Sequence, residues 1–210
     1  MPLYKYAQID TNSAIALWHI NESEETLIKG SAPTDWIQMA YKERTHSRKR
    51  KEWLAARITL KYLLDKLGHK YTELQKDVYG QPYLVGSSLH LSLAHGSSFA
   101  LVAVSEQYPI GVDIQWPYQK LLKVREKFLD DYEIQDGGDD LDKLCIYWCA
   151  KEAIYKVQGG RHLSLKNDIR IEKFTKKRQG IVWGSVGLQP FVVHYNFCDG
   201  HVLAWSQEWK

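Results

Sequence analysis

The chain has 210 residues, of which 44% are hydrophobic and 25% charged, and its formal net charge is +3. This composition is that of a globular protein with one large or two small domains. The longest apolar run, residues 99–104, is too short to span a bilayer, and the first residues lack the apolar segment of a signal peptide. Its three cysteines cannot all pair and show no metal-ligand spacing. We therefore expect a cytoplasmic protein with no membrane partner.

The N-terminal half alternates strands with one long helix. The predicted elements are, in chain order, strands over 3–9 and 14–20, a helix over 50–67, a turn at 79–82, and strands over 89–93 and 99–105. Residues 48–51 put four cations at the start of the long helix, where positive charge is unfavourable unless an anion joins them. This hints at anion binding, and the alternative is a solvated basic face.

The C-terminal half ends in a series of strands. The predicted elements are a strand over 110–115, a helix over 124–128, a loop at 136–140, a helix carrying Glu152, and strands over 169–174, 181–186, 191–197 and 202–206. The strand pair within 89–105 resembles the pair within 191–206. We therefore predict an α+β fold of two similar halves, residues 1–106 and 107–210.

Two carboxylates stand out from this pattern. Asp113 lies on a strand of β-branched residues, where it is costly if buried without a partner. Glu152 lies on a predicted helix beside two lysines. If the two carboxylates converge, the natural occupant is Mg²⁺, which takes oxygen ligands and completes its shell with water and phosphates. Gln115, on the Asp113 face of the strand, could add a neutral oxygen.

Cations near these carboxylates suit a ligand with several phosphates. They are Lys151, Lys156, Arg50, Lys51 and Arg57. A metal together with cations is the equipment of phosphoryl-group transfer, in which catalysis is mainly positioning and charge stabilisation. The alternative for the helix is an ordinary surface pair of Glu152 with Lys156, one turn apart.

Two motifs resemble the signatures of the 4′-phosphopantetheinyl transferases, a G-[IV]-D-[IV]-x strand and a W-x-x-K-E-[AS]-x-x-K helix. Residues 111–115 match the first, and residues 148–156 match the second at every fixed position. Residues 124–133 resemble the family's R/K-F…E segment, residues 80–83 its G-K-P turn, and residues 92–96 its S-x-S-H-S segment. Two ordered signatures with the histidine segment ahead of them make the resemblance specific.

The resemblance implies a reaction and an architecture. Enzymes of this family move the phosphopantetheine arm of coenzyme A onto a serine of an apo acyl or peptidyl carrier protein and release 3′,5′-ADP. The two-half pattern is similar to the larger, Sfp-type branch, whose members are monomers. In that branch a pseudo-twofold relates two α+β halves, and the active site lies between them.

Carried over by motif, Asp113 and Glu152 would bind Mg²⁺, and Glu152 would also take the proton of the carrier serine. Lys156 would stabilise charge on the phosphates and on the departing oxygen, and Lys151 would assist on the phosphate side. His95 would hydrogen-bond a coenzyme A phosphate. The cations Arg50, Lys51 and Arg57 occupy the region that holds the 3′-phosphate.

Four positions depart from the family pattern. Gln115 stands where a glutamate is often a third metal ligand, which removes a negative charge from the expected site. Gln81 stands where a lysine commonly contacts the adenine-nucleotide end of the ligand. Ala94 and Gly96 replace the serines that flank His95, which removes hydroxyl contacts to phosphate. The Asp–Glu–Lys set is intact, so we expect these changes to be tolerated.

Two other functions use the same residues. A metal-dependent phosphohydrolase acting on a coenzyme A-like nucleotide would use Asp113, Glu152 and Lys156 with water as the nucleophile. A basic nucleic-acid-binding module would use residues 48–51 and 173–178, and its affinity would fall steeply with salt. The aromatic residues are spread through strand-like runs, which favours the core over base stacking, so we predict no nucleic-acid partner.

Overall fold

The computed structural model describes residues 3–31, 35–96, 98–159 and 162–208. The N-terminal half contains β1 (Leu3–Asp10), β2 (Ser13–His19), α1 (Glu24–Gly30), α2 (Asp35–Lys42), α3 (Ser47–Leu67), β3 (Leu74–Lys76), β4 (Pro82–Leu84), β5 (His90–Gly96) and β6 (Phe99–Ser105). The C-terminal half contains β7 (Ile110–Gln115), α4 (Lys120–Val124), a 3-10 turn η1 (Arg125–Lys127), α5 (Asp131–Gly137), α6 (Leu141–Val157), β8 (Ile169–Ile171), β9 (Gln179–Val186), β10 (Gln189–Cys198) and β11 (His201–Gln207). The predicted α+β class is confirmed.

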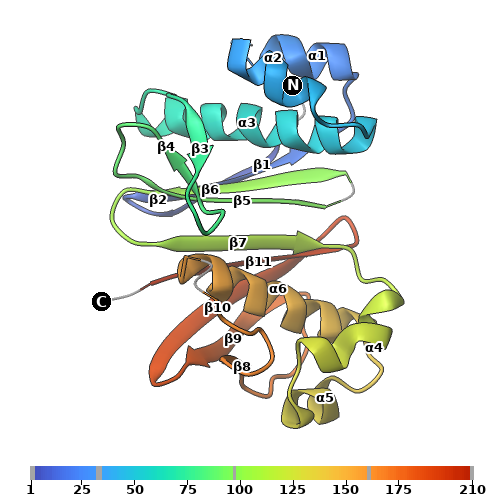
Figure 1. Cartoon of the computed structure of the whole chain (residues 1–210). Helices are drawn as coiled ribbons and strands as arrows, with labels where there is room; N and C mark the ends of the chain where they lie inside the picture. The colour runs from blue at the N-terminus through green and yellow to red at the C-terminus, as the bar shows by residue number, and fades with distance from the viewer. Residues whose placement is uncertain (1–2, 32–34, 97, 160–161, 209–210) are drawn as a thin grey trace.

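Four layers make up the molecule (Figure 1). Helix α3 covers an antiparallel sheet with strand order β1-β2-β6-β5, and α6 covers an antiparallel sheet with order β7-β11-β10-β9-β8. The two sheets pack on each other through their remaining faces. A small β3–β4 hairpin lies apart from both sheets, beside β5.

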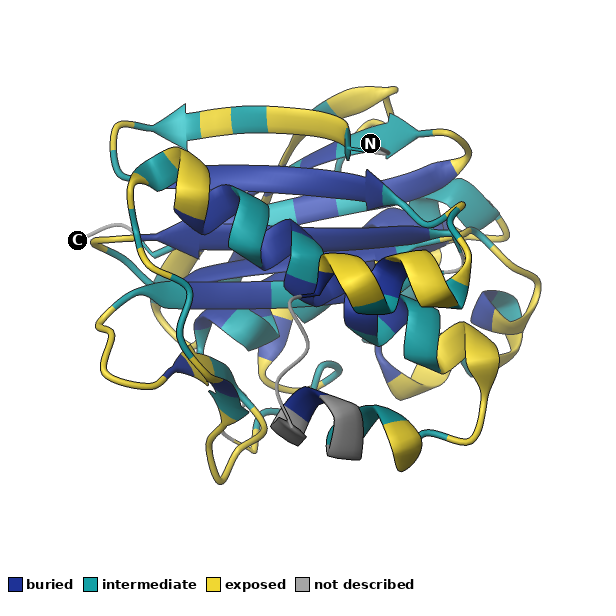
Figure 2. Ribbon diagram, turned by 90° about the horizontal axis from the view of Figure 1, so that it is seen from above, coloured by how far each residue is buried: buried dark blue, intermediate teal, exposed yellow. Residues whose placement is uncertain are grey.

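Strand β6 shows why the layers stack in this order. All seven of its residues are buried. Because side chains alternate along a strand, Ala100, Val102 and Val104 pack toward α3. Phe99, Leu101 and Ala103 pack toward the second sheet. Figure 2 shows the buried strands at the centre and the exposed residues on the helices and loops around them.

Most of the long elements lie where the sequence predicts them, and the short ones differ. Helix α3 begins at Ser47, before the predicted start at residue 50. The predicted helix over 124–128 is the end of α4 followed by η1. The loop predicted at 136–140 contains the end of α5, which a capping box between Asp130 and Glu133 begins. Strands β3 and β4 flank the turn predicted at 79–82.

The boundary between the two sheets falls between β6 and β7, close to the predicted division at residues 106 and 107. Each half has one antiparallel sheet with a long helix on its outer face. The independence of the halves and their pseudo-twofold relation stay predictions. No helix among the described residues is long and apolar enough to cross a membrane.

Candidate active site

The close contact between β7 and α6 positions the site. A Cβ atom on Gly111 would lie 1.9 Å from the carbonyl oxygen of Ala153 and 2.9 Å from the backbone nitrogen of Val157. Glycine therefore allows the helix backbone to rest on the strand. Asp113 lies on the same face of β7 as Gly111. Since Glu152 and Lys156 immediately precede Ala153 and Val157, this contact brings all three predicted residues together.

The Lys156 ammonium is anchored on β7. Its Nζ donates to the carbonyl oxygen of Val112 at 2.7 Å and to Asp113 Oδ1 at 2.9 Å. The other carboxylate oxygen of Asp113, Oδ2, is buried and accepts no hydrogen bond among the described residues. An unsatisfied buried carboxylate oxygen is costly. Asp113 thus retains an acceptor for a further cation or donor.

The carboxylate of Glu152 is electrostatically strained beside Asp113. Burial raises the pKa of Glu152 to about 7, the Asp113 charge adds to the rise, and Lys156 opposes it. Asp113 has an oxygen without a hydrogen bond, and Glu152 has a raised pKa. A divalent cation bound to both carboxylates would satisfy that oxygen and favour the ionised form of Glu152.

Within the described residues, no group of three or more histidine, cysteine, aspartate or glutamate side chains could hold a metal ion. A cation at Asp113 and Glu152 would therefore take its other ligands from water and from the bound substrate, which fits Mg²⁺ better than a metal that needs an all-protein cage.

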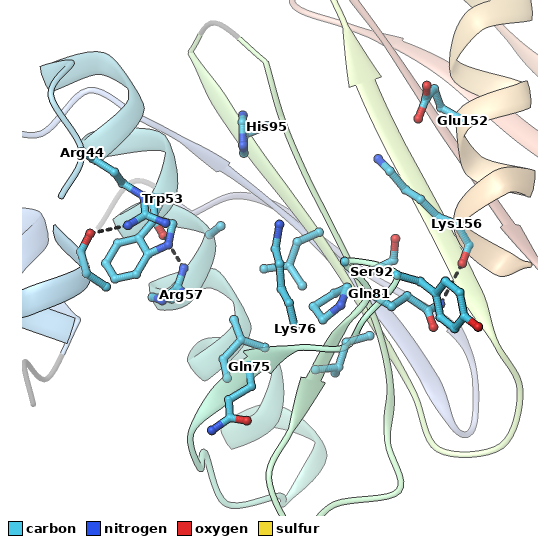
Figure 3. Close-up of a pocket in the computed structure, with 18 of the residues that line it drawn as sticks. Arg44, Trp53, Arg57, Gln75, Lys76, Gln81, Ser92, His95, Glu152 and Lys156 are labelled. Atoms are coloured by element: carbon cyan, nitrogen blue, oxygen red, sulfur yellow. Dashed lines mark hydrogen bonds between the residues drawn. The ribbon is translucent and has the colours of Figure 1, made fainter. Parts of the chain in front are cut away.

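A cavity of about 600 Å³ opens between the two halves, beside these residues. Figure 3 shows Glu152 and Lys156 of α6 on one side of it and Arg44, Trp53 and Arg57 on the other. The lining residues are Ala40, Glu43, Arg44, Trp53, Ala56, Arg57, Leu74, Gln75, Lys76, Tyr79, Gly80, Gln81, Pro82, Leu91, Ser92, Leu93, His95, Glu152, Tyr155 and Lys156. The two halves therefore build one site, which suits a ligand of substantial size.

Two arginines stack on a tryptophan at the far end of the cavity. The guanidinium carbon of Arg57 lies 3.5 Å from the centroid of the Trp53 ring, and that of Arg44 lies 4.4 Å from it. Burial lowers the pKa of Arg57 to about 10, so this side chain is still protonated at neutral pH. The stack holds two positive charges at the cavity wall.

A buried glutamate orients His95. Glu52 Oε2 lies 3.1 Å from His95 Nδ1, and the Glu52 side chain is 2% exposed. Burial acts to raise the pKa of Glu52, but hydrogen bonds from His95, Lys49 and Arg48 outweigh it and lower the pKa to about 2. An ionised carboxylate only accepts, so Nδ1 carries the proton that is donated to Glu52. The other ring nitrogen, Nε2, is left for a ligand.

The part of the chain that carries Asp113, Glu152 and Lys156 is similar to known proteins. Residues 109–206 match the family model of the 4′-phosphopantetheinyl transferase superfamily, a span that runs from just before β7 to near the end of β11 and includes Asp113, Glu152 and Lys156. The C-terminal half of the chain is therefore similar to this superfamily. A Haemophilus influenzae protein named "Putative 4'-phosphopantetheinyl transferase" is 24% identical over 173 residues, which cover 71% of this chain and 72% of that protein.

The similarity to the superfamily does not place every residue that the motif suggests. Lys151 is fully buried, and its Nζ donates to Glu133 Oε2 at 2.6 Å and to the carbonyl oxygens of Ile169 and Leu165 at 2.7 and 2.9 Å. An ammonium has three N–H donors, and all three are used. The expected phosphate contact of Lys151 is therefore wrong, and Lys151 joins α6 to α5 and to the segment around β8.

Of the three cations predicted for the 3′-phosphate, only Arg57 lines the cavity. Arg50 donates from Nε to Glu24 Oε1 at 2.5 Å, and neither it nor Lys51 reaches the cavity lining. The structure also corrects the hint of an external anion at the start of α3. The chain supplies the anions itself, through Glu24 and through Glu52.

The two glutamines that depart from the superfamily pattern also have places in the structure. Gln81 lines the cavity, and its Nε2 donates to the carbonyl oxygen of Lys156 at 3.0 Å, which ties the β3–β4 turn to α6. Gln115 donates from Nε2 to the carbonyl oxygen of Trp116 at 3.2 Å and does not line the cavity. Its role as a metal ligand stays a prediction.

Sequence reasoning missed four side chains of this site, namely Arg44, Glu52, Trp53 and Lys76. Glu52 carried a usable signal, because it follows Arg48 by four residues and Lys49 by three on one helix face. Arg44, Trp53 and Lys76 lie on segments that meet the motif residues only in the folded chain.

Proposed function

We propose that this protein transfers the 4′-phosphopantetheine arm of coenzyme A to a serine of an apo acyl or peptidyl carrier protein and releases 3′,5′-ADP, in an Mg²⁺-dependent reaction. The observation that carries the proposal is the convergence of Asp113, Glu152 and Lys156 at one end of a cation-lined cavity. The match of residues 109–206 to the 4′-phosphopantetheinyl transferase superfamily supports it.

Asp113 and Glu152 would hold the metal, which when bound would neutralise charge on the pyrophosphate of coenzyme A. Glu152 would also accept the proton of the carrier serine, since a general base must lie within reach of the reacting hydroxyl and Glu152 lines the cavity. Lys156 has two N–H groups engaged on β7. Its third N–H is free to reach a phosphate oxygen on the leaving ADP.

The other walls of the cavity are assigned to the nucleotide end of coenzyme A. His95, held by Glu52, would donate to a phosphate from Nε2 in its doubly protonated form, since Nδ1 already carries the proton that Glu52 accepts, and Arg57 would add its charge. Both walls come from one chain, which supports a monomeric enzyme of the larger, Sfp-type branch. We further propose that this enzyme acts in the cytoplasm.

The test is intact-mass spectrometry of apo acyl and peptidyl carrier proteins incubated with the protein, coenzyme A and Mg²⁺. The expected result is a mass gain of one phosphopantetheine arm. Glu152→Gln and Asp113→Asn should each slow the gain by about 10² to 10³-fold, since each removes a charge that acts on the reacting groups. Glu25→Gln, an exposed change on α1, is the matched control and should leave the rate unchanged.

Two results would contradict the proposal. If no carrier protein gains mass and coenzyme A stays intact, the protein is not this transferase. If coenzyme A is cleaved in the absence of any carrier protein, the metal-dependent phosphohydrolase takes its place.

A further inference from the structure

The cations that line the cavity differ in how the chain already uses them. Arg44 donates to the carbonyl oxygen of Ala40, and both Arg44 and Arg57 stack on the Trp53 ring. Lys156 is bonded to Asp113. Lys76 also lines the cavity and is exposed, and its side chain makes no hydrogen bond or ion pair with any of the described residues.

The position of Lys76 directs it into the cavity. It is the last residue of β3 and pairs with Pro82 of β4. Leu74 and Gln75, the two residues before it, also line the cavity, so all three residues of β3 border it. Figure 3 shows the side chain rising from β3 into the cavity, between the Arg44–Trp53–Arg57 group and Lys156.

The charge of Lys76 is not balanced from the cavity wall. The carboxylates of the lining are Glu43, next to Arg44, and Glu152, next to Lys156 and Asp113. Gln81, on the same hairpin, is neutral, and its amide is engaged with α6. Among the described residues that line the cavity, Lys76 is the one charged residue of the β3–β4 hairpin. Its charge attracts a polyanion, and no hydrogen bond of its side chain has to break when the polyanion binds.

We propose that Lys76 is a phosphate-binding residue of the coenzyme A site. This inference rests on the proposed function and adds a contact from outside the two motifs. The Lys76 ammonium donates to a phosphate oxygen of the bound nucleotide and serves binding alone, because it lies across the cavity from Glu152 in Figure 3. Its loss weakens ligand binding equally in the ground state and the transition state, so KM rises and kcat does not change.

The test is calorimetric titration of coenzyme A into the whole protein with Mg²⁺ present. Lys76→Gln is expected to raise Kd about tenfold, the scale of one charge-assisted hydrogen bond. Lys76→Arg should stay within about threefold of the parent, because it keeps the charge. Lys70→Gln, an exposed lysine outside the cavity lining, is the matched control and should bind like the parent.

A second ligand identifies the phosphate. If Lys76→Gln weakens coenzyme A but not dephospho-coenzyme A, Lys76 binds the 3′-phosphate. If it weakens both equally, Lys76 binds the pyrophosphate. Either result supports the inference.

The inference is overturned if Lys76→Gln binds coenzyme A as tightly as the parent, or if it lowers kcat with Kd unchanged. A lower melting temperature for Lys76→Gln without ligand would assign a structural role and would also overturn it. Failure of the proposed function looks different: the parent protein would then bind no coenzyme A, or bind it and modify no carrier protein.

Discussion

Glu152 carries its proton differently in the folded and unfolded chains. Burial, with the Asp113 charge, raises the pKa of Glu152 from 4.5 to about 7. Between these values the folded protein binds more protons than the unfolded chain, so stability falls as the pH rises through that window and is constant above it. The rise corresponds to roughly 3 kcal/mol at about 1.4 kcal/mol per pKa unit, and partial exposure of the side chain reduces this to about 2 kcal/mol.

Glu152→Gln should remove this pH dependence. Without divalent metal, we expect the stability of the variant relative to the parent to increase by about 2 kcal/mol from pH 5 to pH 8, because only the parent loses stability over this range. Urea unfolding at both pH values measures the difference. Adding Mg²⁺ at pH 8 should stabilise the parent more than the variant. Parallel pH profiles of parent and variant would show that Glu152 is not strained in the folded state.

Residue spacing shows which site residues lie close together only when one helix or strand carries them. Glu152 and Lys156 are one helical turn apart, so their shared face is readable from spacing alone. The error at Lys151 arises because neighbouring residues on a helix point about 100° apart, and this rotation takes Lys151 into the protein core while Glu152 lines the cavity. Glu52 and His95 meet only through the packing of α3 on β5, which no local pattern encodes.

The contact between β7 and α6 is the element that the active-site geometry depends on. A methyl group at Gly111 would collide with the backbone of α6 and not with a flexible side chain. Gly111→Ala should therefore force α6 away from β7 and separate Asp113 from Lys156. We expect a loss of about 3 kcal/mol in the free energy of unfolding, together with a loss of carrier-protein modification.

Gly30→Ala is the control for this change, because the nearest atom to its Cβ is the end of the Ile58 side chain at 3.3 Å, which can shift. Chemical denaturation of both variants checks the prediction. Equal stability of Gly111→Ala and the parent would mean that α6 does not depend on a glycine at this position.

Elements are predictable from the sequence in proportion to their length. The periodicity of α3, β6 and β7 extends over enough residues to identify each of them. Helix α5 was missed because its signal is a single capping box, followed at once by Gly137 and Gly138. Strands β3 and β4 have three residues each, too few for a period of two to be recognised.

The cavity lies where the edge strands of the two sheets run beside each other. Strands β5 and β7 each end the order of their sheet, and they pack together without forming a ladder between the described residues. The free edge of β7 is satisfied by side chains instead. The backbone N–H of Val112 donates to Ser92 Oγ at 2.9 Å, and its carbonyl accepts from Lys156 Nζ.

The sequence could not predict this arrangement, because hydrophobic alternation identifies the faces of a strand and says nothing about which edges of two sheets become neighbours. The predicted division near residue 106 lies close to the boundary between the two sheets, yet one of the polar bonds across that boundary connects Ser92 to a backbone group. A hydroxyl in a strand gives no sign of such a partner before the chain is folded.

Ser92→Ala should therefore weaken the whole molecule. The change leaves the buried N–H of Val112 without its acceptor, at a cost of about 1–3 kcal/mol in the free energy of unfolding. Since the sheets share the core between them, both halves should lose stability together. Urea unfolding followed by tryptophan fluorescence and by far-ultraviolet circular dichroism should give one coincident transition, shifted to lower urea.

Ser185→Ala is the matched control, a strand serine whose hydroxyl makes no hydrogen bond among the described residues, and its effect should lie within about 0.5 kcal/mol. An unshifted midpoint for Ser92→Ala would show that water replaces the hydroxyl at Val112. Two separate transitions, with only one of them shifted, would show that residues 1–106 and 107–210 unfold independently. If the halves share a core, the loss of a hydrogen bond between them should destabilise both.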